Sequence, residues 1–282
     1  MSSYSKCGLS ILNNAELDCI VMEPFPHLVV RKALPPELYA QLANEYPSID
    51  TILSDGKVPQ NNRRYQINAQ RGLSTDILHE SWREFVQYHV SSDFWGEVVA
   101  KLGPAIRHVY PALEEQMGRN LGDFSLSVRG EAESDVVLDC QPGINSPVTR
   151  VSSVRGPHVD NPVELFAGLL YFRSPEDDST GGDLVLHRHR RSSPTFWGKA
   201  GLWESDVEPF ATIPYEANTL VLFINGPESI HAVTPRSLTQ HPRRLVNFIG
   251  EIYGTGGLFK LPRNLSTLGR IKNKWFSWRH GG

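Results

Sequence analysis

The segment Gly156–Pro162 contains two side chains that could bind one metal ion. Residues two apart in an extended strand point to the same face, so the His158 imidazole and the Asp160 carboxylate can reach one ion together. A third candidate ligand, His231, lies 71 residues after Asp160, beyond an apolar strand and an Asn-Gly turn that could return the chain. Two histidines and one carboxylate on one face of an octahedral ion leave three positions open. That arrangement suits non-haem Fe(II) with a chelating co-substrate and O₂.

Two arginines begin the strand that is expected after His231. Arg243 stands twelve residues after this histidine and opens the mostly apolar run 243–249. A guanidinium there offers a fork of donors to a dicarboxylate. Arg244 is the alternative, because a one-residue shift in strand register would turn the other side chain inward.

A single His-x-Asp triplet is weak support for a metal site. A chain with 10 His and 31 Asp+Glu produces such triplets by chance, and most lone histidines are surface or structural residues. The order of the surrounding motifs is the stronger signal, because several of them follow one another in a fixed sequence along the chain.

This order resembles that of the prolyl-4-hydroxylase-like branch of the Fe(II)/2-oxoglutarate-dependent dioxygenases. The resemblance covers about Val136–Tyr253, less than half of the chain. Its most specific parts are His158-Val-Asp-Asn-Pro162, Gly181-Gly-Asp-Leu184 and His231-Ala-Val-Thr-Pro235, followed by Arg243. The first part also looks like a stretch of the oxygen-sensing prolyl hydroxylases, but the neighbouring loops differ.

The resemblance implies a role for each matching residue. His158, Asp160 and His231 would bind Fe(II), and Arg243 would pair with the distal carboxylate of the co-substrate 2-oxoglutarate. With O₂, such an enzyme hydroxylates an unactivated C–H bond and releases succinate and CO₂. Because Asp160 is present, where related halogenases have a small residue, the resemblance implies hydroxylation or desaturation.

Two further residues are candidates for 2-oxoglutarate contact. Family members often have a Tyr immediately before the Pro-Gly pair that corresponds to Pro142-Gly143, which we expect to form a turn. This chain has Gln141 there, which can still donate through its amide. Tyr171, at the end of an apolar strand, is another possible phenol donor, and a core tyrosine is an equal alternative.

Substrate contacts are expected on loops, where specificity usually resides. Arg155 lies in the segment 141–155 just before the metal motif, and Arg188 and Arg190 lie in the basic loop His187–Lys199. These arginines are candidates for binding an anionic substrate, and a solvated surface loop is the default alternative. A second metal site in the basic loop is disfavoured because its flanking cations repel a divalent ion.

The β-rich part of the chain must position these residues. Short apolar runs separated by Gly, Pro, Asn and Asp, without helices between them, indicate an antiparallel barrel or sandwich. We therefore expect an α+β, mainly β fold, namely a double-stranded β-helix (a jelly-roll, cupin-like barrel) with an N-terminal helical layer. The expected strands are 124–129, 135–140, 164–172, 183–187, 219–224 and 245–253.

The N-terminal part of the chain reads mostly as helix. Pro35-Pro36 opens an amphipathic helix, and Ser74-Thr-Asp76 is expected to cap a helix that carries Trp82 and Phe85. Gly103-Pro104 is expected to break the next helical segment in two. We expect one domain over residues 1–282, in which 1–120 are mostly helical support, 121–255 form the β-helix core and 256–282 form a basic amphipathic helix.

Composition limits the other possibilities. The chain has 282 residues, a net charge of −3 and 40% apolar residues, enough for a substantial core. The near-neutral balance argues against nucleic-acid binding, and neither a membrane span nor a signal peptide is expected. Three cysteines are too few and too scattered for a disulfide framework, which favours a reducing, cytoplasmic location.

The expected C-terminal helix has two interpretations. Residues 260–282 carry Lys and Arg without Asp or Glu, and their apolar residues recur every three or four positions. Such a helix can lie on an anionic membrane or on a partner. Packing on the barrel or on a second subunit is favoured, because the apolar stripe is rich in aromatic side chains that are normally buried.

The sequence therefore predicts an Fe(II)- and 2-oxoglutarate-dependent dioxygenase that acts on a small molecule or a peptidyl, prolyl-type substrate. The alternative from another class is a non-catalytic jelly-roll protein that binds a metal or ligand, or senses one. The natural substrate cannot be read from the chain.

Overall fold

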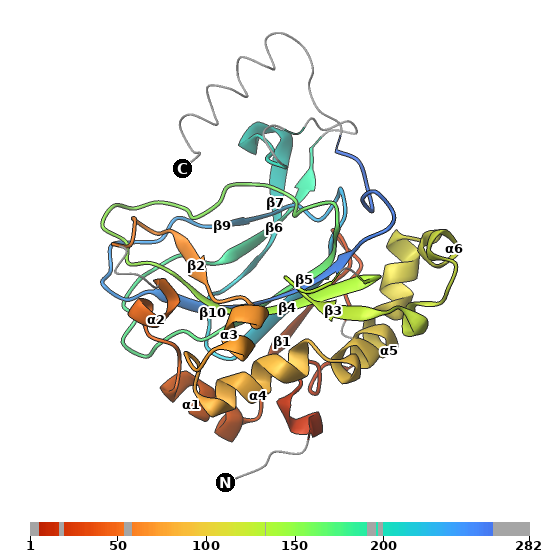
Figure 1. Ribbon diagram of the computed structural model, residues 1–282. Coiled ribbons are helices and arrows are strands. Elements are labelled where there is room, and N and C mark those ends of the chain that lie inside the picture. Colours follow the sequence, from red (N-terminus) through yellow and green to blue (C-terminus); the bar gives the residue numbers. More distant parts are fainter. Residues whose placement is uncertain are drawn as a thin grey trace.

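Two antiparallel sheets face each other in the computed structural model, which describes residues 6–16, 20–53, 58–132, 134–190, 196 and 200–261. Helices cover one side of the large sheet, and the small sheet lies on its other side. Figure 1 shows α1, α4 and α5 below the large sheet and the strands of the small sheet, β6, β7 and β9, above it. The molecule is thus layered as helices, large sheet and small sheet. This is the expected mixed α+β double-stranded β-helix with an N-terminal helical layer.

The large sheet supplies one wall of the barrel. Its strands follow the order β1-β8-β5-β10-β4-β2, and β3 pairs with β4 in parallel. Strands that lie far apart in the sequence are therefore neighbours, as between β4 and β10. The strand bounds are β1 His27–Arg31, β2 Arg64–Gln66, β3 Leu126–Val128, β4 Val136–Asn145, β5 Glu164–Tyr171, β8 Thr219–Ile224 and β10 Arg243–Ile252.

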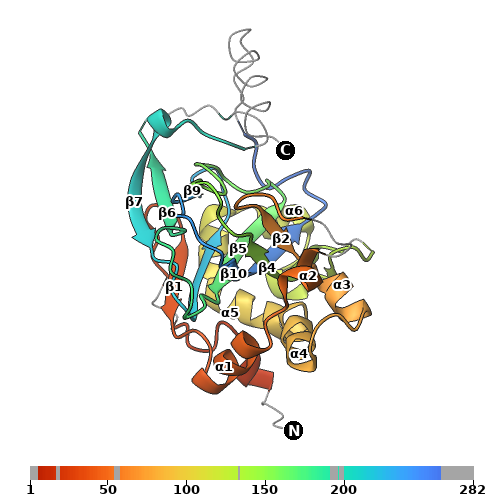
Figure 2. The same cartoon turned by 90° about the vertical axis from the view of Figure 1, so that its left-hand side faces the viewer.

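The small sheet supplies the opposite wall. Its order is β7-β6-β9, with β6 at Leu184–His189, β7 at Val207–Ile213 and β9 at His231–Val233. The segment around His158 extends this sheet, because His158 forms antiparallel bridges to His231 on one side and to Gly201 on the other. Figure 2 shows the small sheet standing apart from the helical layer, with the large sheet between them.

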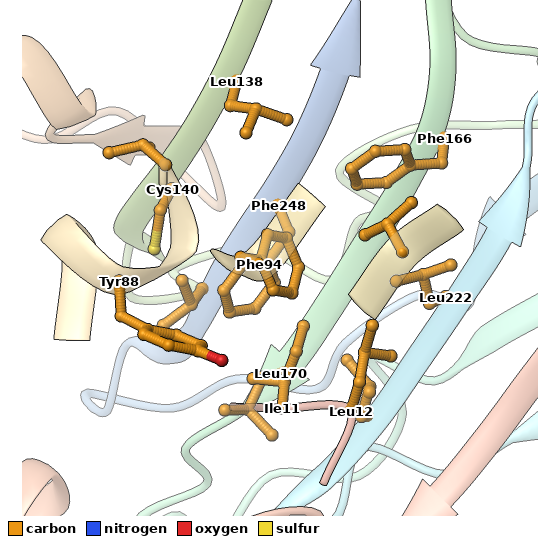
Figure 3. Packing of buried hydrophobic residues seen from close by; sticks show 14 of the residues in the cluster. Ile11, Leu12, Tyr88, Phe94, Leu138, Cys140, Phe166, Leu170, Leu222 and Phe248 are labelled. Atoms are coloured by element: carbon orange, nitrogen blue, oxygen red, sulfur yellow. The ribbon is translucent and has the colours of Figure 1, made fainter. Parts of the chain in front are cut away.

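The helical layer packs on the outer face of the large sheet. Trp82 and Phe85 from α4 and Phe94 from α5 are buried there together with the outward-facing residues of the strands. Figure 3 shows part of this packing, in which the ring of Phe94 lies close to those of Phe248 and Tyr88. The helix bounds are α1 Pro36–Asn44, α2 Ile49–Leu53, α3 Ala69–Ser74, α4 Glu80–His89, α5 Ser92–Val109 and α6 Leu113–Met117.

Each strand of the large sheet divides its side chains between two compartments. Cys140 and Ile144 of β4 belong to the core under the helices. Because side chains alternate along a strand, Asp139, Gln141 and Asn145 must face the small sheet instead. All three of these polar residues are buried. The inner face of β4 therefore carries buried polar groups.

A separate apolar cluster fills part of the space between the sheets. It includes Leu169 and Tyr171 of β5, Val221 and Phe223 of β8, and Leu186 of β6. Because this cluster joins both walls, it holds the barrel closed beside the polar residues of the inner face.

Helix α5 corrects the expected break at Gly103-Pro104. The helix runs without interruption through Pro104, although proline lacks the N–H that an interior turn uses. Leu102, Ala105 and Ile106 around it are buried in the core. Burial of this apolar face holds the helix together despite the lost hydrogen bond.

The expected N-cap of the preceding helix, α4, is also wrong. Ser74 ends α3, whereas the helix that carries Trp82 begins at Glu80 with His79 at its N-cap position. Ser74 thus belongs to α3, a short helix whose N-terminus is capped by the Asn68 side chain accepting from the Arg71 backbone N–H.

The expected turn at Pro142-Gly143 is a third correction, because both residues lie inside the continuous strand β4. Gly143 is required there for a different reason. A Cβ at this position would lie 2.7 Å from the backbone oxygen of Tyr65 in β2. The glycine therefore lets β2 approach β4 closely.

The remaining expectations concern the two ends of the chain and the cysteines. The proposed C-terminal helix lies outside the described residues from position 262 onward, and 256–261 are not helical. Among the described helices, none is long and apolar enough to cross a membrane. Cys140 is buried with a free thiol.

Candidate active site

His158 and His231 form a backbone pair between two segments of the small sheet. The N–H of His158 donates to the carbonyl of His231 at 3.0 Å, and the N–H of His231 donates back at 2.9 Å. Directly opposed residues in an antiparallel pair present their side chains on the same face. The two imidazoles are accordingly neighbours, with ring centroids 4.1 Å apart.

The alternation predicted for the His-Val-Asp segment is present. Val159 points away from the barrel into a small apolar cluster with Leu202 and Ile230. His158 and Asp160 therefore point to the opposite side, toward His231. One potential ligand atom from each of the three residues lies within 4.8 Å of the others, and the described residues contain no other such group.

Backbone carbonyls orient both imidazoles. Nδ1 of His158 donates to the carbonyl of Gly156 at 2.7 Å, and Nδ1 of His231 donates to that of Ser229 at 2.9 Å. Each Nε2 is then left with its lone pair, 3.6 Å and 3.5 Å from the oxygens of Asp160. This is how proteins usually hold a metal-binding histidine, with one nitrogen fixed and the other free to coordinate.

His89 shows what a structural histidine looks like in the same protein. Its Nδ1 also bonds to a backbone carbonyl, that of Phe85 at 2.8 Å. Its Nε2, however, accepts the backbone N–H of Ile11 at 3.2 Å. Both nitrogens of His89 are used by the core, whereas His158 and His231 each keep one nitrogen directed at a carboxylate.

Burial keeps the two site histidines neutral. It is the largest cause that lowers the pKa of His158 to about 3, and the nearby His231 and Arg155 add to it. Burial likewise lowers the pKa of His231. Neutral imidazole is the form that binds metal, so both ligands are available at neutral pH.

Asp160 stays ionised in this buried position. Burial alone would raise the pKa of its carboxyl, but His231, His158 and Arg155 together hold it below the ordinary value. Arg155 reaches Asp160 at 3.3 Å and is half exposed on its outer side. The carboxylate is therefore available as an anionic ligand.

The turn before His231 is tied to the loop after Asp160. The amide of Asn225 donates to the carbonyls of Asn161 and Glu164, both at 2.9 Å. Its oxygen accepts from the hydroxyl of Ser229, whose carbonyl in turn orients His231. This buried network links the two ligand-bearing segments and fixes their spacing.

Arg243 lies fully buried between two aromatic rings on the inner face of β10. Its guanidinium carbon is 4.8 Å from the ring centre of Tyr171 and 4.7 Å from that of Tyr215. Nε donates to the carbonyl of Gly182 at 2.8 Å and Nη1 to Asn145 at 3.2 Å. Nη2 has no hydrogen-bond partner among the described residues.

The Gly-Gly pair that follows β5 in sequence makes this position possible. Gly181 and Gly182 both have positive φ, at 75° and 79°. A Cβ on Gly182 would lie 3.3 Å from the Arg243 side chain, and a Cβ on Gly181 would clash with the carbonyl of Pro235. Only glycine suits this backbone and this close approach.

The register of β10 determines which of the two arginines lies inside the barrel. Arg243 pairs with Asn145 of β4 and faces the small sheet, whereas Arg244 faces the helical layer. The Arg244 guanidinium lies over the ring of Tyr46, 5.4 Å from its centre. Arg243 is therefore the arginine inside the barrel.

Two inner-face residues that the sequence did not single out accompany Arg243. Arg64 of β2 pairs with Asn145 of β4, which pairs with Arg243 of β10, so the three form one row across the sheet. Four donors of this region lack a hydrogen-bond partner among the described residues, namely Nε of Arg64, Nδ2 of Asn145, the hydroxyl of Tyr171 and Nη2 of Arg243. Buried polar groups are normally paired. Four unpaired donors together indicate a pocket for an anion that accepts hydrogen bonds.

Gln141 lies on the same face but is engaged by its neighbours. Its amide nitrogen donates to Asp139, and its oxygen accepts from Asn247 at 3.3 Å. Both of its neighbours here are buried or partly buried side chains of the inner face. Its expected contact with 2-oxoglutarate stays a prediction.

The other candidate substrate residues differ in their placement. Arg155 lies beside Asp160 in the group of metal-binding side chains formed by His158, Asp160 and His231. Arg188 pairs with Glu208, and Nε of Arg190 donates to the carbonyl of Val207, so both are held by β7. Their role in substrate binding stays a prediction. Residues 187–189 of the expected basic loop belong instead to β6, and 191–195 and 197–199 lie outside the described residues.

Glu164 is a further titratable group near the metal cluster. Burial, together with the negative charges of Asp160 and Glu251, raises its pKa to about 8. This shift favours its protonated form, so Glu164 adds less negative charge beside Asp160 than an ordinary carboxylate would. The sequence did not indicate this shifted pKa, because it shows Glu164 only as a glutamate at the start of an apolar strand.

Comparison with known proteins identifies the fold. No protein-family model matches the chain, and no curated protein sequence matches it. Among solved structures, prolyl 4-hydroxylase of Phytophthora capsici matches with a TM-score of 0.50 and 15% identity, covering 99% of this chain and 76% of that one.

Two other matches have lower TM-scores. Prolyl-4-hydroxylase of Pseudomonas putida matches with a TM-score of 0.45 and 13% identity, covering 80% of this chain and 92% of that one. The epimerase SnoN, solved with Fe³⁺, alpha-ketoglutarate and nogalamycin RO, matches with a TM-score of 0.45 and 11% identity over 85% and 91% of the two chains. The P. capsici match shows that this chain has the prolyl 4-hydroxylase fold, and a shared fold alone does not select a reaction.

Proposed function

We propose that this protein is an Fe(II)- and 2-oxoglutarate-dependent dioxygenase that hydroxylates an unactivated C–H bond of a small molecule or a peptidyl side chain. The observation that carries the proposal is the cluster of His158, Asp160 and His231, in which both imidazoles present an unprotonated nitrogen beside one carboxylate. Two histidines and one carboxylate with open positions suit non-haem Fe(II).

The residues present fit both groups that the proposal requires. Neutral imidazoles and an ionised carboxylate are the donor set for Fe(II). The unpaired donors of Tyr171 and Arg243, next to this cluster in the barrel, fit the distal carboxylate of 2-oxoglutarate. Bound together, iron and 2-oxoglutarate would supply O₂-dependent oxidation, in which 2-oxoglutarate, O₂ and substrate give succinate, CO₂ and hydroxylated substrate.

The protein's own contribution is to hold the metal ligands and the co-substrate in place and to shield them from solvent. Backbone carbonyls fix the ring orientation of both histidines, and Asn225 fixes the distance between their segments. Arg243 is buried between Tyr171 and Tyr215, where water does not compete for a carboxylate. These features orient a co-substrate and exclude solvent, which is the main task of a protein that uses a reactive cofactor.

The substrate class is the open part of this proposal. A peptidyl proline is one candidate, because the P. capsici protein is named a prolyl 4-hydroxylase. A free small molecule is the other, since the chain shares only the fold with that protein. Epimerisation is a further outcome within the same chemistry, given the name of SnoN.

Succinate formation from 2-oxoglutarate tests the proposal without a known substrate. Purified protein supplied with Fe(II), O₂ and 2-oxoglutarate is expected to form succinate slowly, and Asp160→Ala should not. A protein that binds Fe(II) and 2-oxoglutarate but forms no succinate under any tested substrate would support the alternative, a non-catalytic jelly-roll binding protein.

A further inference from the structure

Arg64 brings a second cation to the inner face of the barrel. It occupies the same cross-strand row as Asn145 and Arg243, and adjacent strands are about 4.8 Å apart. Its Nε is buried and has no hydrogen-bond partner among the described residues. A guanidinium nitrogen removed from water without an acceptor is costly, so this position is explained best by a ligand that supplies one.

The charges around Arg64 are mostly of its own sign. Burial lowers the pKa of Arg64 to about 10, and the next two causes are the positive charges of Arg243 and Arg155. Asp160 is the negative group that opposes them. The guanidiniums of Arg243 and Arg155 are thus close enough to Arg64 to repel its positive charge.

The three arginines differ in how far their hydrogen-bonding groups are satisfied. Nε and Nη1 of Arg243 donate to Gly182 and Asn145, and Nη1 of Arg155 lies 3.3 Å from an oxygen of Asp160. The Nε of Arg64 is buried and has no hydrogen-bond partner among the described residues.

The arginines also differ in position. Arg243 is enclosed by Tyr171 and Tyr215, which leaves it to the co-substrate. Arg155 stands beside Asp160 with 51% of its side chain exposed, so it borders solvent at the metal cluster. Arg64 acts on both of them and on Asp160. Arg155 therefore offers a guanidinium that is next to the metal ligands and reachable from outside, and Arg64 lies within electrostatic range of it.

We infer that Arg64 and Arg155 bind an anionic group of the substrate, a carboxylate or a phosphate, while Arg243 holds 2-oxoglutarate. The inference rests on the proposed function and narrows its substrate class to acidic molecules. It makes Arg64 a specificity-determining residue, because a neutral substrate of the same shape would leave the Arg64 guanidinium unpaired.

Paramagnetic relaxation tests this inference with simple anions. The protein is loaded with Mn(II) and N-oxalylglycine, an analogue that occupies the 2-oxoglutarate position without turnover. Relaxation of the ³¹P signal of inorganic phosphate, and of the methyl protons of acetate in a parallel series, then reports an anion bound near the metal. We expect saturable enhancement in the wild-type protein, and the anion that binds more tightly identifies the group.

Variants connect the signal to Arg64. Arg64→Gln should weaken anion binding at least tenfold, and Arg64→Lys should retain part of it because the charge remains. Arg63→Gln is the matched control, since Arg63 is the exposed neighbour on the same chain segment. Both Arg64 variants should stay folded and keep the wild-type affinity for N-oxalylglycine, and Arg64→Gln should have a thermal midpoint no lower than that of the wild-type protein because it removes the repulsion.

Three results would overturn the inference. Wild-type protein that binds N-oxalylglycine but shows no saturable anion effect has no second anion site. Equal binding by Arg64→Gln would remove this residue from such a site. Mutual displacement of phosphate and N-oxalylglycine would place Arg64 in the co-substrate pocket. Failure of N-oxalylglycine itself to bind the Mn(II) protein would instead contradict the proposed function, so the two failures are distinguishable.

Discussion

His158 and His231 are held together by two backbone hydrogen bonds, one in each direction, at 3.0 and 2.9 Å. Their side chains take no part in this pairing. The geometry of the metal cluster is therefore set by the backbone of the small sheet, and the imidazoles can be removed without removing the pairing that positions them.

This separation predicts the behaviour of ligand variants. His158→Ala, Asp160→Ala and His231→Ala should each lose Fe(II) binding and succinate formation while the protein stays folded. Metal content after dialysis and circular dichroism check the two halves of the prediction. His108→Ala, at an exposed position of α5, is the control and should behave like the wild-type protein. Near wild-type activity in any ligand variant would show that the cluster is misassigned.

The two adjacent arginines of β10 should differ sharply. Arg243→Gln is expected to raise the 2-oxoglutarate concentration required for succinate formation about 10- to 150-fold, the equivalent of a charge-assisted pair worth roughly 1.5–3 kcal/mol. Arg244→Gln, on the opposite face against Tyr46, should leave that requirement within about twofold. The KM for 2-oxoglutarate measures both, and the reverse pattern would mean that the strand register in solution is shifted by one residue.

Tyr171→Phe separates a ligand contact from a structural one. The Tyr171 hydroxyl is buried without a partner among the described residues, so its removal should not lower the free energy of unfolding. The same change should weaken 2-oxoglutarate binding by roughly tenfold, about 1.4 kcal/mol. Urea denaturation and the KM for 2-oxoglutarate are the measurements. A less stable variant with an unchanged KM would make Tyr171 a core tyrosine only.

The buried His89 predicts a dependence of stability on pH. Burial lowers the pKa of His89 to about 3, compared with about 6.5 in the unfolded chain. Below pH 6.5 the unfolded state binds the proton and the folded state does not. The free energy of unfolding should therefore fall with decreasing pH, by up to about 1.4 kcal/mol per pH unit for this one group, until about pH 3.

Urea denaturation between pH 7 and pH 4.5 measures this slope. His89→Gln keeps an acceptor for the N–H of Ile11 and removes the titration. The variant should have a lower free energy of unfolding at pH 7 than the wild-type protein. Its free energy of unfolding should also fall less steeply as the pH decreases, and the difference in slope should correspond to about one bound proton. Parallel pH curves for the two proteins would contradict the assignment.

The local parts of the site could be predicted from the sequence because they depend on strand alternation alone. His158 and Asp160 share a face since they are two apart in an extended segment. The order of these two residues, His231 and Arg243 along the chain can be read directly from the sequence. The choice between Arg243 and Arg244 could not be made, because it depends on how β10 pairs with β4.

Other features depend on contacts that no local pattern contains. Arg64 joins the inner face only because β2 pairs with β4. Asn145 of β4 is paired with Arg64 on one side and with Arg243 of β10 on the other, so two strand registers must be known to place the three residues in one row. The expected break at Gly103-Pro104 and the expected turn at Pro142-Gly143 were wrong for a related reason. Both rest on the local preferences of proline and glycine, and burial or a close strand approach outweighs these preferences in the folded chain.

The row of Arg64, Asn145 and Arg243 has a consequence for how the protein matures. Arg64 and Arg243 are 179 positions apart in the sequence, and His158 and His231 are 73 apart. The chain loses conformational entropy when loops of this length close, and this loss comes before the contacts between their ends can stabilise the fold. The site is therefore assembled late in folding. On the ribosome, no competent site exists until β10 has emerged and paired with β4. An iron ion held by these residues would therefore meet a finished barrel rather than a growing chain, which would keep a reactive metal away from unfolded polypeptide.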